Sequence, residues 1–355
     1  MTDNKYEDSK KKAGYDTFPT NFTVTQHNIG PQEYKKENIF YDKNEKDYSK
    51  LINTVFIKKE RTLEYYFNTM IKNEDKSDIY LLQEVAEGDE DKDESIDIDG
   101  VSYNYKYYKT GNINRLTINK YKLEKYDINN ISHGCAVVWN SEKFKESKKD
   151  IIKYTGNKRR SSDCITLSEI VNETNKIKVI SLHGSIFNPI NRYINIDRIE
   201  VYKFLNTILT DYSAEKIIIG TDFNYELKSF NANINSDIVI IDDMLNILIK
   251  YKNKSDIDSD QYKKIYDNHN FANFLKYLTK IRELIDSSNI YPTNLDHTGS
   301  LKQIDYILSK NLNNSSYETK RYLSKINKNI YKEVDLENFD NTNFDHSRLI
   351  YKFNW

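Results

Sequence analysis

The sequence predicts a mixed α and β fold of the α+β class, organised as one large domain. Short apolar runs rich in β-branched residues alternate along the chain with segments of helical spacing. Polar residues close most of these runs, in six short segments that extend from Thr25 to His346. If these segments form one site, most of the 355 residues belong to one domain, although the length alone suggests roughly two or three.

The first third of the chain alternates between strand and helix patterns. Residues 1–20 are polar and predict a disordered lead-in to a single domain over residues 21–355. A strand that begins at Phe22 ends where Gly30 and Pro31 break it. Apolar residues over 50–72 recur at close to helical spacing, and residues 78–82 form a buried apolar run. The prediction is therefore strand, helix, strand.

The rest of the chain continues the mixed pattern. The acidic segment 87–99 has no apolar period and predicts a solvated loop. Residues 194–209 predict a helix, and residues 238–290 predict a helical insertion of two helices, for which padding, a lid and a partner surface all stay open. Further strands are expected at residues 135–139, 164–171, 177–182, 217–220, 303–308 and 349–353.

Composition excludes several classes of protein. The chain is 38% hydrophobic, which suffices for a core at this length, and its formal charge of −1 gives no global attraction to a polyanion. Cys135 and Cys164 are its two cysteines, too few for a disulfide framework or a zinc site. No run approaches the roughly 20 apolar residues of a membrane helix. We expect an intracellular, soluble monomer without a membrane anchor.

The polar residues at the strand ends are of the types that phosphate-ester hydrolysis requires. The reaction needs neutralisation of the nonbridging oxygens, a deprotonated water and help for the departing oxygen. Glu84 and Asp345 are placed to hold a hard cation, usually Mg²⁺, with Mn²⁺ as the alternative. Asp222 and Asn224, two residues apart, offer a pair that orients and activates the water.

Histidines supply the remaining functions. His183 and His346 follow strand-like runs and offer imidazoles that bind phosphate or transfer protons. Asp305 lies between apolar neighbours, where a carboxylate is costly unless it is paired, and it could fix the tautomer of one imidazole.

Each residue also has a structural interpretation when it is taken alone. Glu84 could be an ordinary carboxylate at a strand end, and single histidines are more often structural than catalytic. Residues 222–224 could form a plain turn, because Gly, Asp and Asn favour turns. The joint occurrence of all these residues in this order favours the catalytic interpretation.

Taken in order, the segments resemble those of the endonuclease/exonuclease/phosphatase superfamily, the DNase I-like metal-dependent phosphodiesterases. The resemblance covers almost the whole chain, from Phe22 to Phe353. The most specific segments are Leu81-Leu82-Gln83-Glu84-Val85, Ile219-Gly220-Thr221-Asp222-Phe223-Asn224, Ile304-Asp305-Tyr306-Ile307-Leu308 and Asp345-His346. Residues 291–294 and 133–139 resemble the family's Pro-Thr step and its central Gly-containing strand.

The resemblance implies a four-layer α/β/β/α sandwich in which two mixed sheets pack face to face, with a metal site at one rim. It also implies a role for each residue at the site. By this resemblance the metal region holds Asn28, Glu84 and Asp345. His183, Asp222, Asn224 and His346 contact the phosphate or the attacking water, and Asp305 orients His346.

Three positions depart from the family's pattern, and none of them deletes a catalytic group. No Trp or Tyr precedes Asn28, because His27 stands there. Gly184 follows His183, where an apolar residue is common, and Phe344 replaces the Ser usual before Asp345. We therefore expect a competent enzyme.

The substrate is predicted by elimination. No element typical of inositol phosphatases precedes the final strand and no membrane anchor is evident, which leaves a nuclease or a DNA-end-processing phosphodiesterase acting on nucleic acid. Basic and aromatic residues over 103–115 and 153–160 could follow a single strand, although solvated loops are the favoured interpretation. The alternatives are a phosphatase or phosphodiesterase on inositol phosphate or lipid head groups, and a non-catalytic interaction protein that binds an unknown protein partner.

Overall fold

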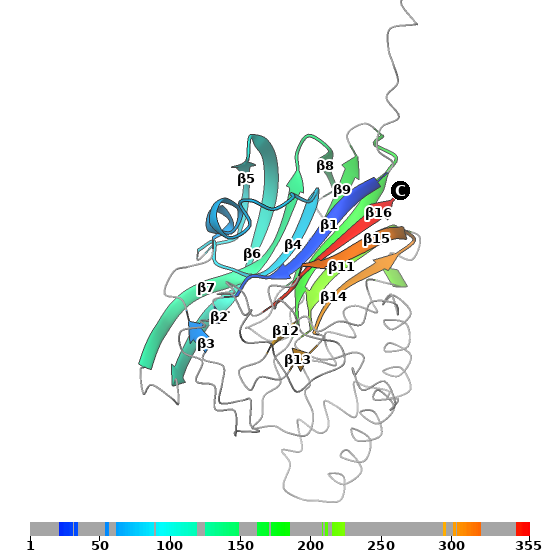
Figure 1. Ribbon diagram of the computed structural model, residues 1–355. Coiled ribbons are helices and arrows are strands. Elements are labelled where there is room, and N and C mark those ends of the chain that lie inside the picture. The colour runs from blue at the N-terminus through cyan, green and yellow to red at the C-terminus, as the bar shows by residue number, and fades with distance from the viewer. Residues whose placement is uncertain are drawn as a thin grey trace, which may run out of the picture.

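The structure is a computed structural model of the whole chain, built around two β-sheets (Figure 1). It describes residues 21–30, 32–34, 54–56, 62–88, 90–118, 125–148, 162–169, 172–184, 208, 210–211, 215–223, 294–295, 301–302, 304–320 and 346–355. The predicted lead-in at 1–20 and the predicted insertion at 238–290 lie outside these residues, as does almost all of the helix expected at 194–209.

The first and last described strands lie side by side in a seven-stranded sheet, called the large sheet below (Figure 1). Its strand order is β15 (Asn313–Lys320), β16 (Arg348–Asn354), β1 (Asn21–Asn28), β4 (Ile79–Val85), β7 (Lys125–Asn140), β6 (Val101–Ile118) and β5 (Lys92–Ile98). Because β1 and β4 are parallel and the other neighbours are antiparallel, the large sheet is mixed.

A five-stranded sheet, called the small sheet, contains the remaining long strands. Its order is β14 (Asp305–Lys310), β11 (Ile217–Asp222), β10 (Lys176–His183), β9 (Ser162–Glu169) and β8 (Phe144–Lys148). Here β10 and β11 are the parallel pair, so this sheet is mixed as well. Two short antiparallel pairs complete the described strands: β2 (Gln32–Tyr34) with β3 (Thr54–Phe56), and β12 (Asn294–Leu295) with β13 (Leu301–Lys302).

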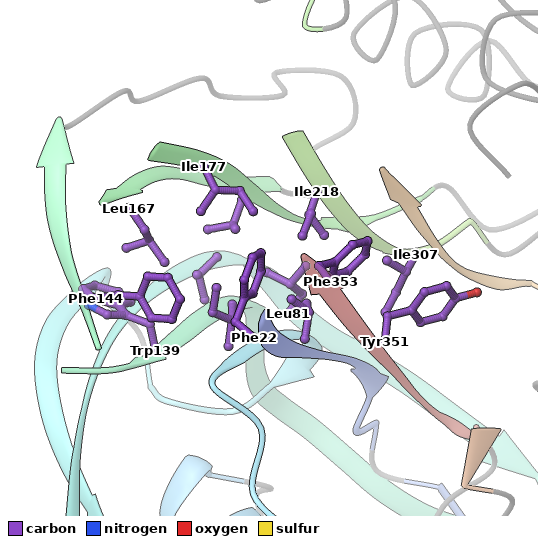
Figure 2. Packing of buried hydrophobic residues seen from close by; sticks show 14 of the residues in the cluster. Phe22, Leu81, Trp139, Phe144, Leu167, Ile177, Ile218, Ile307, Tyr351 and Phe353 are labelled. Carbon is purple, nitrogen blue, oxygen red and sulfur yellow. The ribbon is translucent and has the colours of Figure 1, made fainter. Parts of the chain in front are cut away.

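Apolar side chains from both sheets meet in one buried cluster, which Figure 2 shows between the two layers. Phe22 of the large sheet packs its ring edge-on against Phe144 of the small sheet, with 5.8 Å between ring centroids. The large sheet contributes Val24, Ile79, Leu81, Val137 and Trp139, and the small sheet contributes Leu167, Ile177, Val179, Ile218 and Ile307. The predicted face-to-face packing of two mixed sheets is therefore confirmed.

A short helical segment covers the outer face of the large sheet. The α-helix α1 (Leu63–Tyr65) continues into the π-helical segment η3 (Tyr66–Met70). The Thr62 side chain caps this segment by accepting a hydrogen bond from the Tyr65 backbone N–H. Phe67 packs edge-on against Tyr80 of β4, with 4.9 Å between ring centroids. This face holds a second buried cluster.

Two predictions for this region were wrong. Of the described residues within the helix expected over 50–72, Leu63–Met70 are helical, whereas Thr54–Phe56 form β3, where β-branched and aromatic residues pair with β2. The solvated loop expected over 87–99 contains β5. In this edge strand Ile98 is buried, whereas the acidic residues Asp93, Glu94 and Asp97 are exposed. The many acidic residues concealed the alternation of Ile96 and Ile98 with polar residues.

Three tyrosines of β6 are not accessible to a nucleic acid. Tyr103, Tyr105 and Tyr107 are buried in the second cluster, and burial raises the pKa of Tyr103 to about 12. Lys106, on the opposite face of the strand, lies 2.7 Å from Glu146 and 3.3 Å from Asp93. These three tyrosines therefore lie neither on an exposed loop nor on a surface open to a nucleic-acid strand, and residues 153–160 of the same prediction lie outside the described residues.

Cys135 of β7 is buried, as is common for a cysteine that packs as a small apolar side chain. Within the part of the chain that the structure describes, no helix combines the length and the hydropathy that a membrane crossing needs.

We predict that Phe22→Ala lowers the free energy of unfolding by about 3–5 kcal/mol, because it opens a cavity between rings of both sheets. Ile96→Ala on the edge strand β5 is the matched control, since Ile96 is only partly buried. Urea titration followed by tryptophan fluorescence measures both losses. Equal losses for the two variants would contradict the assignment of the main core to the space between the sheets.

Candidate active site

The candidate site lies where the two parallel strand pairs end. Asn28 ends β1 and Glu84 lies at the end of β4, while His183 and Asp222 end β10 and β11 as partners in register. Carboxyl ends of parallel strands meet at one edge of a sheet, which brings each pair together. Hydrogen bonds then connect the two pairs across the space between the sheets.

Asp222 is at the centre of these contacts. Its Oδ2 accepts a hydrogen bond of 2.7 Å from Asn28 Nδ2, which comes from the opposite sheet. His183 Nε2 lies 3.5 Å from Glu84 Oε1 and 3.6 Å from Asp222 Oδ2, between the two carboxylates. Asn28, His183 and Asp222 are buried, whereas the Glu84 side chain keeps 19% of its surface exposed. The site is a buried polar group with one carboxylate open to solvent.

Glu84 reaches the site through an irregular backbone. Its φ of 55° lies in the left-handed region, which a residue other than glycine adopts rarely. The pairing of β4 with β7 shifts register between Leu82 and Val85, as in a β-bulge. In a regular strand Gln83 and Glu84 would point to opposite faces. The bulge turns both side chains toward the small sheet.

Gly30 leaves the space that the Glu84 carboxylate occupies. A Cβ added at Gly30 would lie 2.2 Å from Glu84 Oε2 and 3.1 Å from Asn28 Oδ1, so no larger residue fits without displacing the carboxylate. The Gly30 backbone N–H donates to Asn28 Oδ1 at 2.9 Å and orients that amide. Gly30 therefore belongs to the site, although sequence analysis assigned it only to the end of a strand.

Asp305 and His346 form a pair beside Asp222. His346 Nδ1 lies 2.8 Å from Asp305 Oδ2, at hydrogen-bond distance, and both residues are buried. Asp305 begins β14, in register with Asp222 of β11, and His346 Nε2 lies 3.9 Å from Asp222 Oδ2. The carboxylate of Asp305, which apolar residues flank in the sequence, therefore has an imidazole as its partner.

Of the predicted site residues that the structure describes, all lie in this group: Asn28, Glu84, His183, Asp222, Asp305 and His346. Asn224 and Asp345 lie outside the described residues. One departure from the family's pattern has a physical reason. A Cβ at Gly184 would lie 2.8 Å from the backbone of Phe223, just past the adjacent ends of β10 and β11, so a larger residue does not fit there.

Other polar residues that the sequence did not predict to be part of the site surround this group. Gln26 Nε2 donates to Asp305 Oδ1 at 3.0 Å, and His27 Nε2 lies 3.3 Å from the His346 carbonyl oxygen. His133 of β7 presents its ring edge-on to His183, with 6.3 Å between centroids. The period of two along β1 could have found Gln26, because it places Gln26 and Asn28 on one face. The contacts of His27 and His133 left no such signal.

The donors at the site suit a hard divalent cation. Glu84 Oε2 and Asn28 Oδ1 gather beside Gly30, and carboxylate and amide oxygens are the ligands that Mg²⁺ and Mn²⁺ prefer. Among the described residues, Asp222, Asp305 and His346 also bring three ligand atoms within 4.8 Å of one another. Because Gln26 Nε2 and His346 Nδ1 already contact the two oxygens of Asp305, this second group is better suited to proton transfer than to metal binding.

Comparison with known proteins gives a likeness in fold. No family model and no curated protein matches the sequence. The chain is similar in structure to endonuclease/exonuclease/phosphatase proteins. One is the human Nocturnin catalytic domain with bound sulfate anion, at 15% identity and a TM-score of 0.45, with 94% of each chain covered.

Two other solved structures are similar to a comparable degree. An endonuclease/exonuclease/phosphatase family protein from Bacteroides thetaiotaomicron has 11% identity and a TM-score of 0.43, with 94% of this chain and 97% of that chain covered. Truncated Caenorhabditis elegans TDP2 has 12% identity and a TM-score of 0.43, with 94% and 98% covered. At such identities the likeness concerns the fold alone.

We predict that Gly30→Ala weakens Mg²⁺ binding by about 10-fold or more while the protein stays folded, because the new methyl group takes the place of Glu84 Oε2. Isothermal titration calorimetry with Mg²⁺ and Mn²⁺ measures the loss, and circular dichroism checks the fold. Gly88→Ala is the control for backbone strain without a contact at the site, since its φ of 105° disfavours alanine but a Cβ there meets no atom within 4 Å. Unchanged Mg²⁺ affinity in Gly30→Ala would contradict the placement of the metal beside Glu84.

Proposed function

We propose that this protein is a divalent-metal-dependent hydrolase of phosphoester bonds, with Mg²⁺ as the metal and a nucleic-acid phosphodiester as the substrate. The supporting observation is the group around Asp222, where two carboxylates, an amide and two imidazoles from both sheets lie within hydrogen-bond or ion-pair range. Burying a carboxylate is costly unless it is paired, and a buried carboxylate with two imidazoles and an amide beside it is a candidate for a functional site.

In this proposal Glu84 is the chief metal ligand, with Asn28 beside it and Asp345 completing the metal region. The bound metal would neutralise charge on the phosphate and lower the pKa of a nearby water. Glu84 suits the role because it is the most exposed carboxylate of the described site, and because its Oε2 lies against Gly30 on the side where Asn28 Oδ1 also lies. Asn28 links the metal region to Asp222 through its amide N–H.

Asp222 would orient and deprotonate the attacking water. Its Oδ2 is fixed by Asn28, so the carboxylate is held in one orientation with little loss of freedom during the reaction. Asn224, two residues further on, would contact the same phosphate. The site's low exposure removes competing water, which strengthens each of these electrostatic contacts.

His183 and His346 would bind the nonbridging oxygens from two sides. Their Nε2 atoms lie 3.6 Å and 3.9 Å from Asp222 Oδ2, so both imidazoles face the position next to that carboxylate. Asp305 would stabilise positive charge on His346 as negative charge develops on the phosphate. Transition-state charge would thus be met by donors that are already in place.

A nucleic-acid substrate rests on elimination, since the buried tyrosines of β6 provide no stacking surface. A hydrolysis assay on a panel of substrates therefore distinguishes diester from monoester substrates. The panel contains bis-p-nitrophenyl phosphate, p-nitrophenyl phosphate, an inositol phosphate, and labelled single- and double-stranded DNA and RNA. Each substrate is assayed with Mg²⁺, with Mn²⁺ and with EDTA.

We predict that Glu84→Ala and Asp222→Asn each lower the hydrolysis rate on the preferred substrate by roughly 10²-fold or more, because each removes a group that acts on the transition state. EDTA should abolish activity, and Mg²⁺ should restore it. Glu142→Ala and Asp75→Asn are matched controls at exposed positions outside the site. Equal rates for the wild type and both site variants would overturn the proposed enzymatic function and favour a binding protein.

A further inference from the structure

A chain of hydrogen bonds crosses between the two sheets directly beneath the site. Gln26 of β1 donates from Nε2 to Gln83 Oε1 of β4 at 2.8 Å. Gln83 donates from Nε2 to Ser181 Oγ of β10 at 3.0 Å, and Ser181 donates to the Leu82 carbonyl oxygen at 2.7 Å. Gln26 Nε2 also donates to Asp305 Oδ1 at 3.0 Å. All four side chains are fully buried.

The Leu82 carbonyl, at one end of this series of hydrogen bonds, fixes the direction of every bond in the series. A backbone carbonyl can only accept, so the single hydroxyl hydrogen of Ser181 is committed to Leu82 and Ser181 must accept from Gln83. Gln83 Nε2 also faces the Leu81 carbonyl oxygen at 3.1 Å, which requires a donor there too. The oxygen of the Gln83 amide therefore faces Gln26.

The same logic orients Gln26. Because Gln83 presents an oxygen, Gln26 must present its NH₂ group, and the second N–H of that group then points at Asp305 Oδ1. Among the described residues, Gln26 Oε1 has no hydrogen-bond partner. Turning the amide would place this oxygen against both Gln83 Oε1 and Asp305 Oδ1. This orientation of the Gln26 amide therefore leaves its buried oxygen without a hydrogen bond, which costs free energy.

We infer that Gln26 is a positioning residue that sets the tautomer of His346 through Asp305. A donor on Asp305 Oδ1 keeps the proton off that oxygen and holds the carboxylate with Oδ2 toward His346 Nδ1. Neutral His346 then carries its proton on Nδ1, and its Nε2, 3.9 Å from Asp222 Oδ2, is the nitrogen that gains a proton when the ring becomes positively charged. The backbone carbonyl of Leu82 thus determines which atoms of Asp305 and His346 carry protons. It acts through three side chains, those of Ser181, Gln83 and Gln26.

The tautomer of His346 can be measured without any substrate, so the test does not depend on the proposed hydrolase function. Two-bond ¹H–¹⁵N correlation spectra of protein labelled with [¹⁵N]histidine, recorded at alkaline pH, report which ring nitrogen is protonated. The chain has six histidines, and a His346→Gln spectrum assigns the signal. The wild type should show the Nδ1-protonated form, and a predominantly Nε2-protonated His346 would overturn the inference.

The isosteric variant Asp305→Asn gives the sharper result. If Gln26 must donate, the amide introduced at position 305 has to accept with its oxygen, and its NH₂ group then faces His346 Nδ1. The His346 tautomer should invert, with the proton on Nε2. In Gln26→Met/Asp305→Asn the amide at position 305 is released and can accept again, so the Nδ1-protonated form should return. Retention of the wild-type tautomer in Asp305→Asn alone would show that Gln26 does not set it.

A matched control separates this effect from general loss of buried polarity. Thr25, next to Gln26 on β1, is fully buried and hydrogen-bonds Ser77 Oγ at 2.7 Å on the outer face of the large sheet. Thr25→Val/Asp305→Asn should keep the inverted tautomer. If this control also restores the Nδ1-protonated form, the change arises from destabilisation of β1 and the inference fails.

A kinetic readout applies where the proposed function holds. Gln26→Met should lower kcat on the preferred substrate by about 10-fold to 100-fold with little change in KM, because Gln26 positions a catalytic pair and touches no substrate. Thr25→Val should leave kcat unchanged. A Gln26→Met variant with wild-type kcat, or with a raised KM alone, would contradict the positioning role even if the tautomer responds.

Discussion

The parallel pairing within each sheet is the constraint on which the rest of the structure depends. Each mixed sheet has one parallel pair, β1 with β4 and β10 with β11, and the registers end at Asn28 with Gln83 and at His183 with Asp222. When the two sheets pack face to face, these two ends meet at one rim. The bond between Asn28 and Asp222 then joins residues 194 positions apart in the sequence. Neither sheet could form this group alone.

The sequence contained much of this arrangement because strands that are buried on both faces leave continuous apolar runs. Strands at 78–82, 177–182 and 217–220 were predicted from apolar runs that end in polar residues, and these runs became β4, β10 and β11. Their polar ends could be predicted to form a site, since a carboxylate beside a buried strand needs a partner. The motif resemblance added the order of the segments, which local patterns cannot supply.

Other features lay beyond local patterns for physical reasons. In β5 the outward positions carry so many acidic residues that the two isoleucines at 96 and 98 did not stand out as a strand. For β3, the apolar residues fitted helical spacing, and only pairing with β2 decides the outcome. Contacts such as His27 with the His346 carbonyl join segments about 319 residues apart, so they depend on the assembled fold and on no sequence spacing.

The bulge in β4 explains how two adjacent residues serve different parts of the same site. Gln83 points between the sheets and joins the buried chain to Ser181, while Glu84, turned by its left-handed backbone, brings its carboxylate toward His183. A left-handed residue other than glycine costs on the order of 1–3 kcal/mol, which the surrounding structure must offset. A regular strand would avoid this cost, but it would send Glu84 to the outer face beneath η3. The strained backbone at Glu84 therefore places the partly exposed carboxylate of Glu84 and the buried amide of Gln83 on the same side of β4.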